Sequence, residues 1–274
     1  MTAAPRAEIG VFGGSGLYQL LDQAESVRCP TPYGDPSDVC TLGVLGGRRV
    51  AFLPRHGRGH TIPPHRINYR ANLWAMRMLG VRRILAPCAV GSLQAAIEPG
   101  AFVIPDQFVD RTHGRADTYA DGPLVGHISA ADPYCPELRA AAAEAARGEG
   151  VTVHQRGTLV VIQGPRFSSR AESRWYTACG WDVVGMTGYP ELILARELGL
   201  CYAAIALVTD HDAGLEGAPE VAPVTHDHVL EVFAANIARV RTVLERAVGE
   251  LSPLPACGCQ GAPAAAGLPR RDDP

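Results

Sequence analysis

One apolar run constrains the fold more than any other feature of the chain. Residues 201–208 read CYAAIALV and contain no charged side chain. The run is too short to span a bilayer, and its length is typical of a strand buried within a sheet. Other short apolar runs alternate with segments of helical periodicity, which favours the α/β class with a mixed or largely parallel sheet. We therefore expect one domain in which helices flank a central mixed β-sheet.

The expected strands and helices follow one another along most of the chain. Besides short strands within residues 29–54, strands are expected at 8–12, 81–90, 101–109, 157–163, 181–186 and 201–208. Helices are expected at 67–78, 137–147, 190–199 and 229–244. The first helix should turn Ile67, Ala71, Trp74 and Met78 to one face. The Pro/Ala/Gly-rich residues 252–274 predict a tail without fixed structure, so the domain is expected to cover residues 1–251.

Composition excludes several classes of function. All 25 basic residues are arginines, because the chain contains no lysine. A lysine Schiff base, a pyridoxal phosphate anchor and a Walker A lysine are therefore impossible. The net charge of −3 gives no reason to expect nucleic acid or an anionic membrane as a partner. The first residues lack the apolar core of a signal peptide, so we expect a cytoplasmic protein.

Eight cysteines are scattered over the chain. No spacing among cysteines and histidines resembles a zinc site, so we expect no metal and no cofactor. Thiols in a reducing compartment are most often buried side chains. Cys257 and Cys259 form the one close pair in the sequence and lie in the tail, which leaves a redox clip open as an alternative.

A basic loop follows the apolar run at residues 50–53. Residues 55–72 contain four arginines and three histidines, together with two prolines that favour a fixed loop shape. Crevices at strand ends are where α/β sheets bind ligands. Arginine is a fixed cation whose planar donors suit phosphate and carboxylate groups. The loop is therefore a candidate anion site, and a solvated basic surface loop is the alternative.

Other predicted strands also end in polar groups. The Gly13-Gly14-Ser15-Gly16 turn lacks the third glycine of a dinucleotide fingerprint, but it can offer backbone N–H groups and a hydroxyl to an anion. Ser15, Arg55, His56 and Thr187 would together suit a free phosphate. Phe167 and the acids Asp210 and Asp212 would suit a flat heterocycle with ring nitrogens.

Taken together, these motifs resemble the trimeric purine nucleoside phosphorylases, in particular their thioadenosine-cleaving branch. The resemblance runs from about residue 8 to residue 248. Its carriers are Gly13-Gly14-Ser15-Gly16, Arg55-His56-Gly57-Arg58-Gly59-His60, Asn68-Tyr69-Arg70-Ala71-Asn72, residues 164–172 (GPRFSSRAE), Met186-Thr187 with Pro190-Glu191, and Thr209-Asp210-His211-Asp212.

The resemblance implies phosphorolysis, in which inorganic phosphate attacks C1′ of a purine nucleoside and releases the free base. Phosphate is then a co-substrate, and its implied contacts are Ser15, Arg55, His56, Cys88, Ala89 and Thr187. The implied nucleoside contacts are His60, His127, Phe167, Ser168, Met186, Asp210, Asp212, His226 and Val229. His127 would come from the neighbouring subunit of a homotrimer, with a dimer of trimers as the larger alternative.

Asp210 is the implied catalytic acid, facing purine N7, and Asp212 would lie near a 6-amino group. An aspartate has an ordinary pKa of about 3.9, so burial must raise it for Asp210 to donate a proton at neutral pH. The apolar run before Asp210 provides such a setting.

Two departures from the family pattern bear on the substrate. Cys88 stands where many thioadenosine phosphorylases have threonine, which removes a hydroxyl donor. His226 stands where that branch has an apolar residue near the 5′ group. We expect 5′-methylthioadenosine as substrate, in purine and methionine salvage. The alternatives are adenosine, inosine or another 5′-substituted adenosine, and, outside enzymes, a binding protein without turnover.

Overall fold

The computed structural model describes residues 7–14, 17, 20–122, 125–214 and 224–267. The strands are β1 (Ile9–Gly13), β2 (Asp22–Val27), β3 (Cys40–Leu45), β4 (Arg48–Pro54), β5 (Arg83–Ser92), β6 (Phe102–Val103), β7 (Gln107–Arg111), β8 (Val153–His154), β9 (Thr158–Ile162), β10 (Val183–Gly185) and β11 (Cys201–Asp210). The helices are α1 (Tyr69–Met78), α2 (Pro136–Gly148), α3 (Arg170–Ala178), α4 (Gly188–Glu197), α5 (His226–Glu250) and α6 (Ala262–Ala265), with 3₁₀ turns η1 (Pro64–Arg66) and η2 (Gly258–Gly261).

The central strand β5 joins the two halves of the sheet. It pairs in parallel with β1 and β11, and its carboxyl end pairs antiparallel with β10. On one side β1 leads through β4 and β3 to β2, and on the other β10 leads through β9 to β7. The short strands β6 and β8 extend from β11. Parallel and antiparallel pairs occur together, which confirms the predicted mixed sheet.

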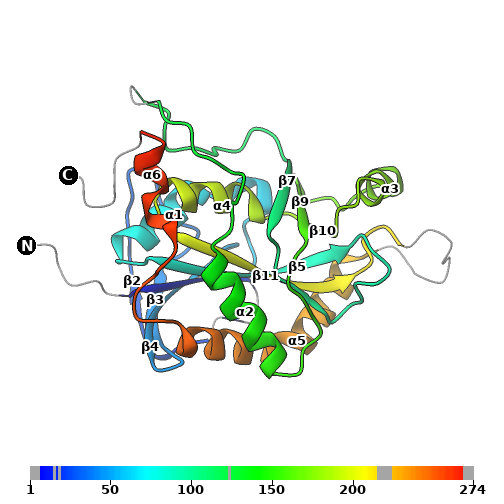
Figure 1. Cartoon of the computed structure of the whole chain (residues 1–274), viewed down its shortest axis with the longest axis horizontal. Coiled ribbons are helices and arrows are strands. Elements are labelled where there is room, and N and C mark those ends of the chain that lie inside the picture. Colours follow the sequence, from blue (N-terminus) through cyan, green and yellow to red (C-terminus); the bar gives the residue numbers. More distant parts are fainter. Residues whose placement is uncertain (1–6, 15–16, 18–19, 123–124, 215–223, 268–274) are drawn as a thin grey trace, which may run out of the picture.

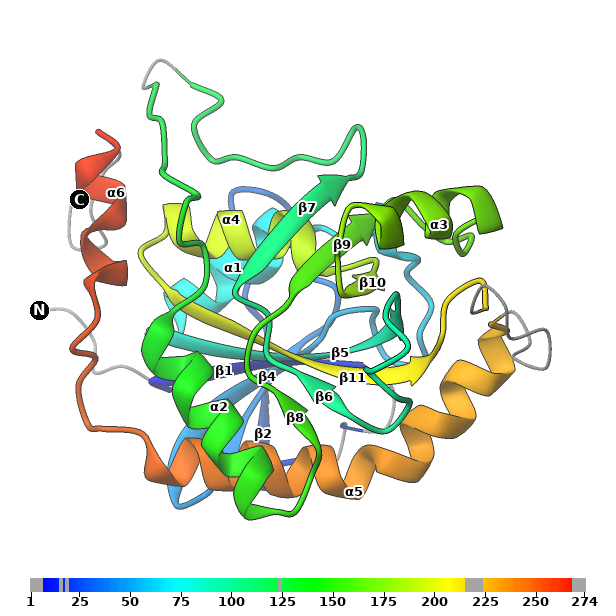
Figure 2. The same cartoon turned by 45° about the vertical axis from the view of Figure 1, so that its right-hand side comes forward.

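Strand β11 is buried along its whole length because helices cover both faces of the sheet. Its odd-numbered residues, such as Ala203 and Ile205, pack into a core with α2 and α5. The even-numbered Tyr202 and Ala204 pack into a second core with α1 and α4. Figures 1 and 2 show these two helix pairs on opposite sides of the sheet. A strand buried on both faces explains why this run lacks the alternation of a half-exposed strand.

Side-chain caps fix the starts of α3 and α5. Ser169 and Glu172 form a reciprocal capping box at the start of α3. The Thr225 hydroxyl accepts a hydrogen bond from the His228 N–H at the start of α5. The residues just before and within these first turns are therefore held in defined positions.

The other predicted strands and helices are found within a few residues of their expected bounds, and Pro105 separates β6 from β7. The predicted face of the first helix is only partly right, since Ile67 and Ala71 are buried but Met78 is not. Met78 is 54% exposed, whereas Leu73 and Met76 are fully buried. Trp74 is half-buried, since it packs against the rim of the second core with its ring edge-on to Tyr33. No helix in the described part of the chain is long and apolar enough to cross a membrane.

The described part of the tail also differs from its expectation. Residues 258–265 form η2 and α6, and Cys259 is buried. A Cβ on Gly199, in the turn between α4 and β11, would lie 3.3 Å from a side-chain carbon of Pro263, so the tail packs closely against this turn. Composition misled here because small residues and cysteines supply the contacts instead of large apolar side chains. The end of the predicted tail, 268–274, lies outside the described residues.

Candidate active site

The ends of six strands, among them β9 with the loop after it, border one cavity of about 410 Å³. Its walls come from residues that follow β1 and β4, from the carboxyl halves of β5 and β11, from β10 with the turn after it, and from the first turns of α5. Most of the predicted site residues line it: Arg55, His56, His60, Cys88, Ala89, Phe167, Met186, Thr187, Asp210, Asp212, His226 and Val229. The fold therefore brings together groups from the whole length of the chain.

Three predicted residues stand apart from this list. Ser168 does not line the cavity, although its buried hydroxyl lies close enough to Asp212 to affect that carboxyl. His127 is exposed on the loop between β7 and α2. Ser15 lies outside the described residues. The predicted contact of His127 across a subunit interface stays a prediction.

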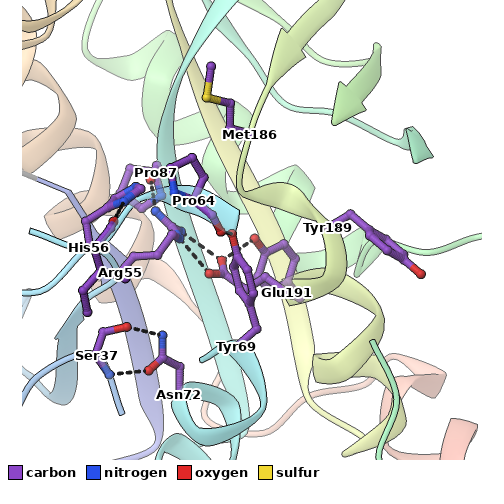
Figure 3. A network of polar contacts seen from close by, with 12 residues as sticks. Ser37, Arg55, His56, Pro64, Tyr69, Asn72, Pro87, Met186, Tyr189 and Glu191 are labelled. Atoms are coloured by element: carbon purple, nitrogen blue, oxygen red, sulfur yellow. Dashed lines mark hydrogen bonds and ion pairs between the residues drawn. The ribbon is translucent and has the colours of Figure 1, made fainter. Parts of the chain in front are cut away.

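A buried ion pair holds the Arg55 guanidinium at the cavity. Nε and Nη2 of Arg55 donate to the two carboxylate oxygens of Glu191 at 2.7 and 2.9 Å, and Nη1 donates to the Pro87 carbonyl at 3.3 Å (Figure 3). The Tyr202 hydroxyl donates to the same carboxylate at 2.7 Å. Arg55 is 2% exposed and Glu191 is fully buried. Burial alone would lower the pKa of Arg55, but the Glu191 carboxylate raises it, so the guanidinium stays charged.

Three of the guanidinium's five N–H groups are used by these bonds, which leaves two for a ligand in the cavity. Glu191 belongs to the Pro190-Glu191 motif, yet its part in fixing Arg55 was not predicted. The sequence shows an acid four residues after Thr187, but it does not indicate which basic residue that acid pairs with.

His56 lies next to Arg55 as a neutral ring. Its Nδ1 is 2.8 Å from the Ile62 carbonyl oxygen, and its ring stacks on His60 with centroids 4.1 Å apart. Burial, with the nearby His60, lowers the pKa of His56 to about 3. A neutral ring that donates from Nδ1 to Ile62 keeps Nε2 as an acceptor. In this state His56 suits a protonated anion oxygen and adds no positive charge.

Thr187 and Cys88 complete this end of the cavity. Thr187 is the N-cap residue of α4, and its hydroxyl makes no capping hydrogen bond. That hydroxyl is therefore available to a ligand in the cavity. Burial raises the pKa of the Cys88 thiol to about 11, so it remains a neutral and weak donor.

Asp210 lies at the end of β11 in a setting that favours its protonated form. The residue is 7% exposed, and burial raises its pKa to about 6. Oδ1 accepts from the Asp212 N–H at 2.7 Å, and Oδ2 lies 2.7 Å from the Thr209 hydroxyl. The same hydroxyl is 3.2 Å from the Val90 carbonyl. Thr209 can thus donate to an ionised Asp210, or accept from a protonated one while donating to Val90.

Asp212 presents an unsatisfied oxygen beside Asp210. Its backbone has a φ of +45°, and among the described residues its Oδ2 makes no hydrogen bond. Burial raises the pKa of Asp212, while the nearby hydroxyls of Ser173 and Ser168 lower it to a smaller extent. A buried acceptor without a partner is costly, which indicates that a ligand donor completes it.

Gly91 makes room for both acids. A Cβ on Gly91 would lie 2.8 Å from Asp210 Oδ1 and 3.1 Å from Asp212 Cβ. Any side chain there would displace one of the carboxyls. The sequence showed Gly91 as the end of a strand and gave no sign of this close approach.

The long loop after β7 contributes an arginine that was also not predicted. The Arg115 guanidinium donates to the carbonyl oxygens of Gln163 and Met186 at 2.9 Å each, and also to that of Tyr189. It thereby ties the loop after β9 to the turn after β10. Met186 and Thr187 are held at the cavity by these backbone contacts.

The first turns of α5 close the remaining side with mixed chemistry. Val229, Leu230 and Phe233 present an apolar wall, and His226 lies beside them. The His60 and His226 rings have centroids 6.2 Å apart. Burial and then His226 lower the pKa of His60. This end can therefore accept either an apolar group or a hydroxyl.

Comparison with known proteins places this geometry in a family. A family model described as the phosphorylase superfamily matches residues 8–249. The chain belongs to the phosphorylase superfamily.

Relatives of this phosphorylase cover nearly its whole length. It is 58% identical to a purine nucleoside phosphorylase of Streptomyces coelicolor, over 96% of this chain and 95% of that protein. It is 52% identical to an S-methyl-5′-thioadenosine phosphorylase of Mycobacterium tuberculosis, over 91% of each. A solved methylthioadenosine phosphorylase of Schistosoma mansoni in complex with adenine superposes with a TM-score of 0.88 at 38% identity, over 94% of this chain and 98% of that one. The expected nucleoside phosphorylase fold is therefore confirmed.

The buried pair in this phosphorylase leads to a stability prediction. Glu191→Gln should lower the free energy of unfolding by about 3 kcal/mol or more, because the buried Arg55 loses its countercharge. Glu172→Gln is the matched control, since Glu172 makes the same two-oxygen pair with Arg166 at the surface. An exposed pair contributes at most about 1 kcal/mol, and glutamine preserves the capping box. Urea denaturation measures both losses, and similar small values would contradict the role of Glu191.

Proposed function

We propose that this phosphorylase is a pentosyltransferase that cleaves 5′-methylthioadenosine with inorganic phosphate, giving adenine and 5-methylthioribose 1-phosphate. The observation that carries the proposal is one cavity with a fixed cation at one end and two buried carboxyls at the other. The relatives named as methylthioadenosine phosphorylases support the choice of substrate. The products are an adenine for purine salvage and a thiosugar for methionine salvage.

Phosphate is proposed to bind at the Arg55 end. The two remaining N–H groups of Arg55 and the Thr187 hydroxyl donate to its oxygens, and Ala89 offers its backbone beside them. The neutral His56 ring accepts a hydrogen bond at Nε2 from the P–OH of the phosphate monoanion. Because Glu191 already neutralises Arg55, the bound phosphate keeps net negative charge. That charge is what stabilises a cationic sugar as the glycosidic bond breaks.

The purine is proposed to lie at the Asp210 end, with Phe167 against the base and Met186 against the ribose. A protonated Asp210 donates to N7, so that adenine leaves as a neutral molecule rather than as an anion. Asp212 Oδ2, which lacks a partner, accepts from the 6-amino group. A 6-oxo group has no hydrogen to offer there, so the site should disfavour it.

The 5′ group is proposed to lie against the first turns of α5. Val229, Leu230 and Phe233 provide the apolar contact that a methylthio group needs. His60 and His226 could instead pair with a 5′-hydroxyl, and the relative with 58% identity is named a purine nucleoside phosphorylase. The alternative function is therefore phosphorolysis of adenosine, inosine or another 5′-substituted adenosine, by the same chemistry.

A substrate panel with and without phosphate tests these proposals. Methylthioadenosine should be cleaved only when phosphate is present, and with a kcat/KM at least about tenfold above that of methylthioinosine, which is roughly 1.4 kcal/mol. Adenosine and inosine repeat the base comparison with a 5′-hydroxyl. Base release without phosphate, or binding without release, would contradict phosphorolysis. Equal cleavage of the two methylthio nucleosides would contradict the role of Asp212, and faster cleavage of adenosine would favour the alternative.

The acid role of Asp210 predicts a pH dependence. Since its pKa is raised to about 6, kcat/KM should fall as pH rises above that value. Asp210→Asn should lose this limb and about 10²–10⁴-fold in activity on methylthioadenosine. The exposed Asp227→Asn, in the first turn of α5, is the control and should keep the parent profile. A parent profile that stays flat from pH 5 to 8 would refute the assignment.

The raised pKa of Asp210 also predicts how the stability of the fold changes with pH. Between the ordinary pKa and about 6 the folded state binds the proton that the unfolded state has lost, so ionisation of Asp210 weakens the fold as pH rises through that window. Asp210→Asn should therefore be more stable than the parent chain at pH 8, and the difference should shrink toward pH 4. Urea denaturation of the parent chain and of Asp210→Asn at pH 8 and at pH 4 measures this difference in the free energy of unfolding.

We propose that the active form is a homotrimer in which His127 of one subunit completes the nucleoside site of the next. Its exposure in the single chain and its place on the long loop support this role. His127→Ala should raise KM for the nucleoside and leave KM for phosphate unchanged. Light scattering at assay concentration gives the mass, and a fully active monomer would refute the assembly.

A further inference from the structure

Four cysteines from distant parts of the sequence meet at one place away from the cavity. Cys135 precedes α2, Cys201 begins β11, and Cys257 and Cys259 lie in the tail. Their sulfur atoms all lie within 4.8 Å of one another. Cys257 Sγ is 3.6 Å from Cys135 Sγ and 3.3 Å from Cys201 Sγ. None of the four lines the cavity.

These separations match those of a tetrahedral metal site. With Zn–S bonds of about 2.3 Å, the sulfurs of a tetrahedral tetrathiolate lie about 3.8 Å apart. Disulfide sulfurs are only about 2.05 Å apart, and all eight cysteines are free. Four thiol ligands with no place for water are typical of structural rather than catalytic zinc.

A buried arginine lies on the same face of the sheet as Cys201. Arg83 stands opposite Cys201 in the pairing of β5 with β11 and is 1% exposed. Its Nη2 has no hydrogen-bond partner among the described residues. Because Nη1 already pairs with Glu8 Oε1 at 3.2 Å, this cation would offset only part of the negative charge of a metal tetrathiolate.

Contacts other than the sulfurs already position the tail. Arg48 donates to the Leu251 carbonyl at 2.8 Å, and Arg83 donates to the Ser252 carbonyl at 2.5 Å. Nearer the cysteines, the Ala256 N–H donates to Glu137 Oε1 at 2.7 Å, which ties the tail to the first turn of α2. In Figure 2 the tail rises from the end of α5 along the side of the molecule on which α2 begins. Cys257 and Cys259 are thus brought to Cys135 by the backbone.

We propose that Cys135, Cys201, Cys257 and Cys259 bind one zinc ion that fastens the tail to the start of α2 and to the first residue of β11. The site is independent of the proposed reaction, since the ion would have no contact with the cavity. Sequence spacing did not reveal it, because one residue separates Cys257 from Cys259 and the other two ligands are far away in the chain. The expectation of no metal is replaced by this proposal.

Metal content and thiol count test the proposal together. The full chain is expressed with zinc, purified without a polyhistidine tag or chelator, and measured by elemental mass spectrometry. About one zinc per chain is expected. Thiol titration in denaturant with chelator should then find all eight cysteines free. Two disulfides in place of zinc would leave four, and that result, or a chain with no zinc, would overturn the proposal.

Paired variants locate the ion. Cys257→Ser combined with Cys259→Ser should lose the zinc and melt at a lower temperature, while the exposed Cys179→Ser should keep both zinc and melting temperature. A chelator should lower the melting temperature of the parent chain and of Cys179→Ser, but not that of the double variant. Phosphorolysis at moderate temperature should persist in the double variant, so failure of the zinc site is distinct from failure of the proposed function. Retention of one zinc by the double variant would overturn the site.

Discussion

The pair between Arg55 and Glu191 is the interaction on which the site depends. Arg55 follows β4 and Glu191 lies in α4, so the pair joins the end of one strand to a helix that packs on the sheet. A guanidinium buried this deeply would be unstable without a countercharge. With Glu191 and Tyr202 in place, the guanidinium keeps one orientation, and its two remaining N–H groups are available to a ligand in the cavity. The rest of the anion end, including Thr187 and His56, is built around that fixed point.

At the opposite end of the cavity, burial acts on two acids, Asp210 and Asp212, that have no such countercharge among the described residues. The two carboxyls are desolvated beside each other, no ion pair to either is found in the described part of the chain, and burial raises their pKa values. One cavity thus contains a charge that is compensated and two acids whose ionisation is disfavoured by burial. A nucleoside and a phosphate need these two environments at once, since one reactant brings negative charge and the other leaves as a neutral base.

The parts of the site that the sequence predicted are those at strand ends. Arg55, Thr187 and Asp210 each follow an apolar run, and strands of one sheet end near one another, so their convergence could be expected. The resemblance to a known family then supplied roles that patterns alone left open. Glu191 could not be predicted as the partner of Arg55 because a countercharge depends on which side chains meet across the sheet. Gly91 could not be found either, because its role is the space that it leaves.

Contacts between distant segments account for the other gaps. Arg115 acts through backbone carbonyl groups, which no side-chain motif marks. The face of α1 was only partly right because Leu73 and Met76, rather than Met78, turn to the core. The tail was expected to lack structure because its composition is poor in large apolar residues, whereas its anchors are cysteines and main-chain carbonyls.

Strand β11 carries Cys201 at one end and Asp210 at the other, on a span of about 30 Å. Every residue between them is buried, and the strand pairs with β5 along most of its length and with β6 near its middle. A strand buried at the centre of the sheet belongs to the last part of the molecule to open. Hydrogen exchange along its paired length would report global unfolding, and the acid would keep its place until this central part of the sheet opens.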